Sequence, residues 1–153
     1  MIRLTRLADY AVVLMSHIAH SPDRLHNAPD IAAETRLPAP TVSKVLKALA
    51  RAGLLTSRRG IKGGYKLARA PEKITIAGII SSVDGPIAVT ECIEDAPGDC
   101  DYEDFCPLCG NWQKINSAIN QALELLSLAD MISPLPPFVA MQSIHRERTT
   151  RPL

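Results

Sequence analysis

All four cysteines of the 153-residue chain lie in one polar segment, ECIEDAPGDCDYEDFCPLCGNW, residues 91–112. They are Cys92, Cys100, Cys106 and Cys109, and Asp, Glu, Pro and Gly surround them. Such a setting disfavours buried, inert thiols. A cytoplasmic protein is expected, and its reducing compartment disfavours disulfides. Metal binding is therefore favoured, and redox chemistry by the Cys106-x-x-Cys109 motif is the alternative.

The spacing leaves the kind of metal open. Structural zinc usually takes its ligands as two close pairs, and only Cys106 and Cys109 form such a pair. Cys92 and Cys100 have seven residues between them, and Cys100 and Cys106 have five. Iron–sulfur clusters accept thiolates from more varied loops. A redox enzyme is disfavoured, because no βαβ unit or cofactor fingerprint accompanies the motif, so no catalytic residue is expected.

The elements that must position these thiols begin with a basic N-terminal half. Residues 1–73 carry 13 Lys and Arg against 5 Asp and Glu, whereas residues 74–153 carry 4 against 11. A basic half indicates an anionic partner, most often nucleic acid, although an unevenly solvated surface gives the same balance. The start of the chain, MIRLTRLADYA, leads directly into a helical pattern and does not resemble a signal peptide.

The N-terminal half predicts a helix-turn-helix. Apolar residues at helical spacing predict a helix over residues 4–20 with Thr5 as its N-cap, and a short helix follows Pro29. The next helix begins near Pro40 and ends at Gly53. Its expected buried stripe comprises Val42, Val45, Leu46 and Leu49, and its outer face carries Thr41, Ser43, Lys44, Lys47 and Arg51. This arrangement is typical of DNA-binding proteins, although a plain helical hairpin shares the pattern.

A β-hairpin after the second of these helices predicts a wing. LLTSRR and YKLAR read as strands joined by GIKGG, whose glycines permit tight turns. Arg58, Arg59 and Lys62 then lie at the wing tip, where they reach phosphates or a narrow minor groove. The expected fold is mainly α with a small β-hairpin: a winged helix-turn-helix followed by a long C-terminal helix.

That C-terminal helix is predicted over residues 111–132 as a dimerisation helix. Its apolar residues recur at intervals of three and four, which is the heptad pattern of paired helices. Docking onto the chain's own body is the alternative. The division is residues 1–85 as the DNA-binding domain, 86–110 as the cysteine loop and 133–153 as a flexible tail. The expected dimer contacts are Trp112, Ile115, Ile119, Ala122, Leu126 and Ala129.

Three stretches resemble the iron–sulfur winged-helix regulators that include IscR, RirA and NsrR. They are RLTRLADYAVVL, the block LPAPTVSKVLKALARAGLLTSRRGIKGGYKLAR, and the cysteine loop before a long helix. The match covers about residues 1–131, and RGIKGGYKL is its most specific part. MIRLTRLADYAVVL is most similar to the branch of regulators of the SUF iron–sulfur assembly system.

The resemblance implies roles for individual residues. Cys92, Cys100 and Cys106 match the three cysteines that bind the cluster, and Cys109 stands where IscR has a histidine. Their spacing is more similar to that of RirA, so the cluster is either 2Fe–2S or 4Fe–4S. Arg59 matches the wing arginine of the family. Ser43 and Thr41 replace a glutamate and a tyrosine of IscR, which implies a different operator.

The sequence thus predicts a homodimeric, cytoplasmic transcription regulator that binds double-stranded operator DNA. It is expected to sense its cluster, to receive that cluster from the iron–sulfur assembly machinery, and to control SUF genes as a repressor or activator. The alternative is a winged-helix regulator with structural zinc or no metal that responds to a metabolite or to thiol oxidation.

Overall fold

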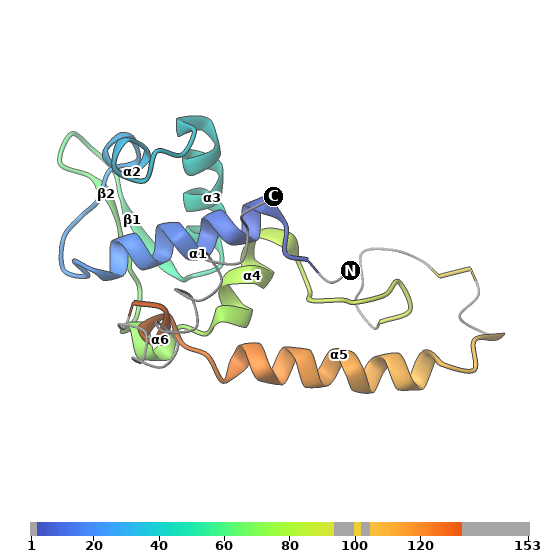
Figure 1. Ribbon diagram of the computed structural model, residues 1–153. Helices are drawn as coiled ribbons and strands as arrows, with labels where there is room; N and C mark the ends of the chain where they lie inside the picture. Colours follow the sequence, from blue (N-terminus) through green and yellow to red (C-terminus); the bar gives the residue numbers. More distant parts are fainter. Residues whose placement is uncertain (1–2, 94–99, 102–104, 133–153) are drawn as a thin grey trace, which may run out of the picture.

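The structure, a computed structural model, describes residues 3–93, 100–101 and 105–132 (Figure 1). The predicted tail from residue 133 lies outside this range. Within it the chain is mainly helical with one antiparallel hairpin, as predicted. No helix in these ranges is both long and apolar enough to cross a membrane. In chain order the elements are α1 (Arg6–Ala19), α2 (Ala28–Thr35), α3 (Ala39–Arg51), β1 (Leu55–Arg58), β2 (Gly64–Leu67), η1 (Pro71–Lys73), α4 (Ile76–Asp84), α5 (Cys109–Glu124) and α6 (Leu128–Ile132).

Local signals set the ends of the N-terminal helices. The Thr5 hydroxyl accepts a hydrogen bond from the Ala8 N–H at 3.1 Å, which caps α1 as predicted. Thr75 caps α4 in the same way through the Gly78 N–H. Gly53 follows α3 with a φ of +73°, a left-handed conformation that glycine adopts without steric cost. These caps satisfy donors and acceptors that a helix end otherwise leaves unpaired.

The core forms around α1, which packs against α2, α3, α4 and α6 (Figure 1). The predicted stripe of α3 is buried, since Val42, Leu46 and Leu49 are fully covered and Val45 nearly so. Burial of these apolar faces is the main force that holds α3 against α1. The opposite face of α3 therefore stays on the surface, where its cations lie.

The hairpin pairs Leu55 with Leu67 at its base and Arg58 with Gly64 at its tip. Both leucines are buried, so the base is fixed to the core. The turn closes through a 2.9 Å hydrogen bond from the Gly63 N–H to the Gly60 carbonyl. A Cβ on Gly63 would lie 2.2 Å from the Arg58 carbonyl oxygen, so the turn admits only glycine there.

The C-terminal half differs from the single predicted helix. α5 begins at Cys109 and ends at Glu124, and α6 starts anew at Leu128. The Ser127 N–H and hydroxyl donate to the Asp130 carboxylate at 2.8 and 2.7 Å, an arrangement that caps α6. These bonds, first that from the Ser127 hydroxyl, lower the pKa of the Asp130 carboxyl.

The break after α5 returns the chain to the winged helix. The Ile76 N–H donates to the Leu126 carbonyl at 2.9 Å, and the Leu128 N–H donates to the Ile74 carbonyl at 2.8 Å. Leu128 is completely buried in the same core as α1 and α4. The core of the predicted domain 1–85 is therefore completed by a residue that lies more than 40 positions further along the chain.

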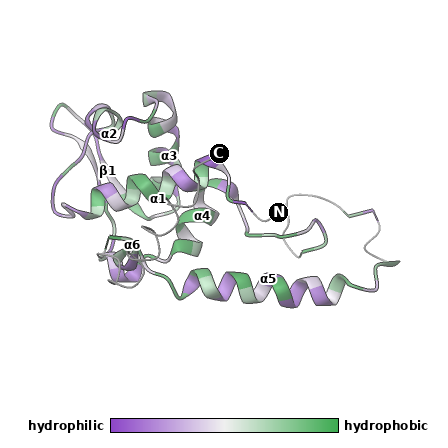
Figure 2. Cartoon of the chain, in the orientation of Figure 1, coloured by the Kyte–Doolittle hydropathy of each residue, from purple (hydrophilic) through white to green (hydrophobic). Residues whose placement is uncertain are grey.

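The heptad pattern divides between these elements. Trp112, Ile115, Ile119 and Ala122 lie on α5, whereas Leu126 lies in the connection and Ala129 on α6. Ile115 is 44% exposed and Leu126 45% exposed. Apolar residues recur along the whole of α5 (Figure 2). Within one subunit α5 therefore leaves much of its apolar surface uncovered.

Candidate nucleic-acid interface and cysteine site

The outer face of α3 presents the predicted recognition residues. Lys44 and Lys47 are exposed, and Thr41 and Ser43 are half-buried. α3 carries no acidic residue. An exposed helix face with cations and short hydroxyl side chains fits the major groove, where cations meet phosphates and hydroxyls meet base edges.

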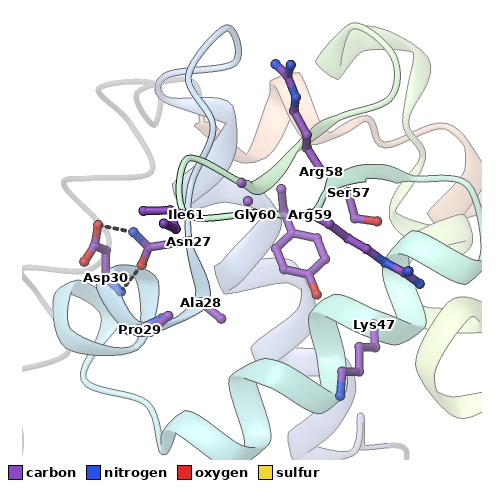
Figure 3. A pocket seen from close by; sticks show the side chains of 13 residues that line it. Asn27, Ala28, Pro29, Asp30, Lys47, Ser57, Arg58, Arg59, Gly60 and Ile61 are labelled. Atoms are coloured by element: carbon purple, nitrogen blue, oxygen red, sulfur yellow. Dashed lines mark hydrogen bonds between the residues drawn. The ribbon is translucent and has the colours of Figure 1, made fainter.

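The wing stands beside this face across an open pocket of about 670 Å³. The pocket is lined by the wing turn, by the start of α2 and by Lys47 of α3. Within it Arg59 extends toward the α3 side, whereas Arg58 points to the opposite side of the wing (Figure 3). Lys62 is exposed in the wing turn and does not line this pocket. The structure thus brings Arg59 and Lys47 to one concave surface, which Arg58 also lines although its side chain points away from α3 (Figure 3).

The wing is fixed to the loop before α2 by a residue whose role the sequence did not reveal. His26 forms a bridge with Tyr65, with N–H to carbonyl distances of 2.9 and 2.8 Å. The approach is so close that a Cβ on Gly64 would lie 2.7 Å from the His26 carbonyl oxygen. His26 is buried, and its ring Nε2 lies 3.0 Å from the Ser21 carbonyl oxygen. The residues of the loop around His26 are not typical of a β-strand, so the sequence did not predict this backbone pairing with the wing.

Three of the four cysteines, Cys92, Cys106 and Cys109, lie at the N-terminal end of α5. Cys109 is the first residue of that helix, and its N–H donates to the Cys106 carbonyl at 3.4 Å. The Cys109 thiol donates to the Cys92 carbonyl at 3.6 Å, although 17 positions separate the two residues. Cys92 is buried, the other three are half-buried, and all four are unbridged thiols. Cys100 lies between stretches outside the described residues.

These thiols suit an iron–sulfur cluster by donor chemistry, since four thiolates are its usual ligand set. In the described residues, however, no three His, Cys, Asp or Glu side chains are gathered closely enough to hold one metal ion. The structure therefore brings Cys92, Cys106 and Cys109 to the same helix end without assembling a ligand sphere. Two amide side chains of α5, Gln113 and Asn116, contact the chain before α5 and were not anticipated.

Comparisons with known proteins agree with this fold. The Rrf2 family, described as "Iron-dependent Transcriptional regulator", matches residues 4–134. The transcriptional regulator NsrR of Halalkalibacterium halodurans is 27% identical over 132 residues, which cover 86% of this chain and 90% of that protein. IscR of Vibrio parahaemolyticus is 29% identical over 132 residues, which cover 86% of this chain and 77% of that protein.

A solved structure is similar over nearly the whole chain. CymR, the global cysteine regulator of B. subtilis, superposes with a TM-score of 0.69 at 26% identity, over 89% of this chain and 100% of that one. A helix-turn-helix with a β-hairpin wing and a basic recognition face defines a winged-helix DNA-binding protein. The chain belongs to the Rrf2 family of transcriptional regulators. It is therefore a DNA-binding regulator and not an enzyme, which confirms the predicted family and class.

Proposed function

We propose that the protein is a homodimeric regulator whose affinity for operator DNA depends on an iron–sulfur cluster held by Cys92, Cys100, Cys106 and Cys109. The observation that carries the proposal is the meeting of Cys92, Cys106 and Cys109 at the N-terminal end of α5. The description of the family as iron-dependent supports the choice of iron over zinc. Four thiolates favour iron–sulfur chemistry more than they favour isolated iron.

A bound cluster supplies a redox-active group that ties together parts of the chain that are otherwise separate. The chain's own contribution is to bring cysteines from different parts of the sequence to one end of α5, where their thiolates would act as the ligands. Cys92 follows α4 of the winged helix, and Cys109 begins α5. Gain or loss of a cluster that joins Cys92 to Cys109 would therefore change how the DNA-binding domain is connected to α5. This is a coupling between the cluster site and the DNA-binding site.

Dimerisation through α5 completes the proposal. Its exposed apolar residues, Ile115 among them, fit a helix-to-helix contact with a second copy. Two copies related by a two-fold axis present two α3 helices to a pseudo-palindromic operator. The regulated genes are those of SUF iron–sulfur assembly, the cluster comes from the assembly machinery, and the protein acts in the cytoplasm.

Cys106→Ala should abolish the visible thiolate-to-iron absorption and reduce bound iron, because the substitution removes a thiolate ligand and puts no donor in its place. The measurement is iron and acid-labile sulfide analysis together with Mössbauer spectra of anaerobically purified protein. Operator affinity is then compared for the cluster-loaded and cluster-free forms. A wild-type protein without iron, or equal operator affinity in the two forms, contradicts the proposal.

A second function is a regulator that responds to a small metabolite and needs no metal. The similarity to the cysteine regulator CymR favours it specifically, because that relation extends over 89% of this chain. Iron-free protein would then bind the operator fully, and an added sulfur metabolite would change the affinity. Titration of metal-free protein with operator DNA, with and without such metabolites, separates the two functions.

A further inference from the structure

Asn116 is the only buried residue of α5, on a helix whose other residues are exposed or half-buried. Its side-chain oxygen accepts from the Val89 N–H at 3.1 Å, and its amide nitrogen donates to the Ile87 carbonyl at 2.9 Å. The side chain thus pairs with the backbone as a neighbouring strand would. A flipped amide would set donor against donor and acceptor against acceptor, so the orientation is determined by the contacts.

One helical turn earlier, Gln113 makes a second contact of the same kind. Its amide nitrogen donates to the Cys92 carbonyl at 3.0 Å, and that carbonyl also accepts from the Cys109 thiol. Positions 109, 113 and 116 share one face of a helix, since they follow the i, i+4, i+7 spacing. Residues 87–92, here called the 87–92 segment, therefore run antiparallel to α5 and end with Cys92 beside its first turn.

We propose that Gln113 and Asn116 are positioning residues that hold the 87–92 segment along α5 and thereby fix Cys92 at the N-terminal end of that helix. The part of this inference that concerns the cluster rests on the proposed function. The two side-chain amides connect a proposed cluster ligand to α5 through backbone groups of the 87–92 segment, so the contact requires the Val89 N–H but no particular side chain between Ile87 and Cys92.

The chemistry of the contacts explains why polar side chains occupy this face. An apolar residue at 116 would leave the Val89 N–H and the Ile87 carbonyl without partners, and an unpaired buried polar group is costly. Ordinary helix packing would be served by an apolar side chain. The partners are main-chain groups of a segment without regular secondary structure. The amides therefore determine the path of that segment and do not stabilise a sheet or helix.

The test uses the full chain, reduced and free of iron, with a pulse of iodoacetamide and mass spectrometry of each cysteine. Gln113→Ala and Asn116→Ala should raise the rate of Cys92 alkylation about tenfold, as removal of one or two partly buried hydrogen bonds predicts. Alkylation of Cys106 should stay unchanged. Gln113→Lys keeps a donor for the Cys92 carbonyl and should restore the slow rate. Gln121→Ala, on an exposed position of the same helix, is the matched control.

An unchanged Cys92 rate in both alanine variants overturns the inference, and so does an equal rise at every cysteine. In a second arm, each variant is reconstituted with iron and sulfide, and the visible absorption per chain is measured. It should fall in Gln113→Ala and recover in Gln113→Lys. If the wild type takes up no cluster while Cys92 alkylation responds as expected, the proposed function fails and the positioning role stands.

Discussion

At the scale of single residues, two neighbouring arginines of the wing have different surroundings. Arg58 and Arg59 both lie at the hairpin tip. Arg59 extends toward α3, whereas Arg58 points away from it (Figure 3). The sequence predicted both as DNA contacts. It could not give their directions, because these depend on the turn that the glycines impose after β1. The structure favours Arg59 as the residue that acts together with Lys47.

Arg59→Ala should weaken binding to the specific operator by about 1–3 kcal/mol for each subunit, the range for a good base-reading interaction. The effect on a dimer is larger, because both wings carry the substitution. Arg58→Ala removes the same charge from the same turn and serves as the control, with a smaller effect on the operator. Fluorescence anisotropy with operator and scrambled duplexes measures both. Equal effects of the two variants would mean that the wing supplies charge without readout.

At the scale of elements, the wing depends on glycine geometry. Gly63→Ala places a methyl group 2.2 Å from the Arg58 carbonyl oxygen, so the turn must reopen and Arg59 must move. Backbone strain of this kind costs the folded state about 1–3 kcal/mol, so the melting temperature should fall. Operator affinity should fall as well, because Arg59 leaves its position beside α3.

Ile61→Ala is the control for that variant, because it alters an exposed side chain in the same turn without changing the backbone. Its operator affinity should equal that of the wild type. An unaffected Gly63→Ala protein would show that the position of the wing turn is irrelevant to DNA binding.

The elements also show what the sequence could and could not predict. Thr5 and Gly53 act over a few residues, so their roles at helix ends followed directly from residue type. The end of α5 did not, because the apolar spacing continues past Glu124 while Ser127 and Asp130 start a new helix. Ser-x-x-Asp is a local cap signal, and it overrides a periodicity that covers fewer than three heptads.

The candidate site was predicted in part for a similar reason. Residue type and spacing identified the cysteines and the cations of α3. The contact of His26 with the wing joins positions that are 39 residues apart, and the contacts of Asn116 with the 87–92 segment join positions that are 27 and 29 residues apart. Each is a contact to backbone atoms. Residue type does not reveal such a contact, because residues of every type carry a backbone.

At the scale of the whole molecule, α5 should pair two subunits. Ile119→Glu would place an unpaired carboxylate in that contact and cost several kcal/mol of association free energy. Sedimentation should then show monomers, with much weaker operator binding. Gln121→Glu introduces the same charge on the exposed face of α5 and should leave the dimer intact. A fully dimeric Ile119→Glu protein would assign Ile119 to contacts within one subunit.

The burial of Leu128 has a consequence for the order in which the chain is completed during synthesis. A ribosome releases the residues of α1 to α4 long before those of α6, yet the core of the DNA-binding domain includes Leu128. Until the residues that follow α5 have emerged, the nascent winged helix therefore lacks the buried Leu128 side chain and the two backbone hydrogen bonds on either side of Ser127. Domains usually fold as units, N-terminal first. Here the DNA-binding domain becomes complete only after the cysteines and α5 have been synthesised.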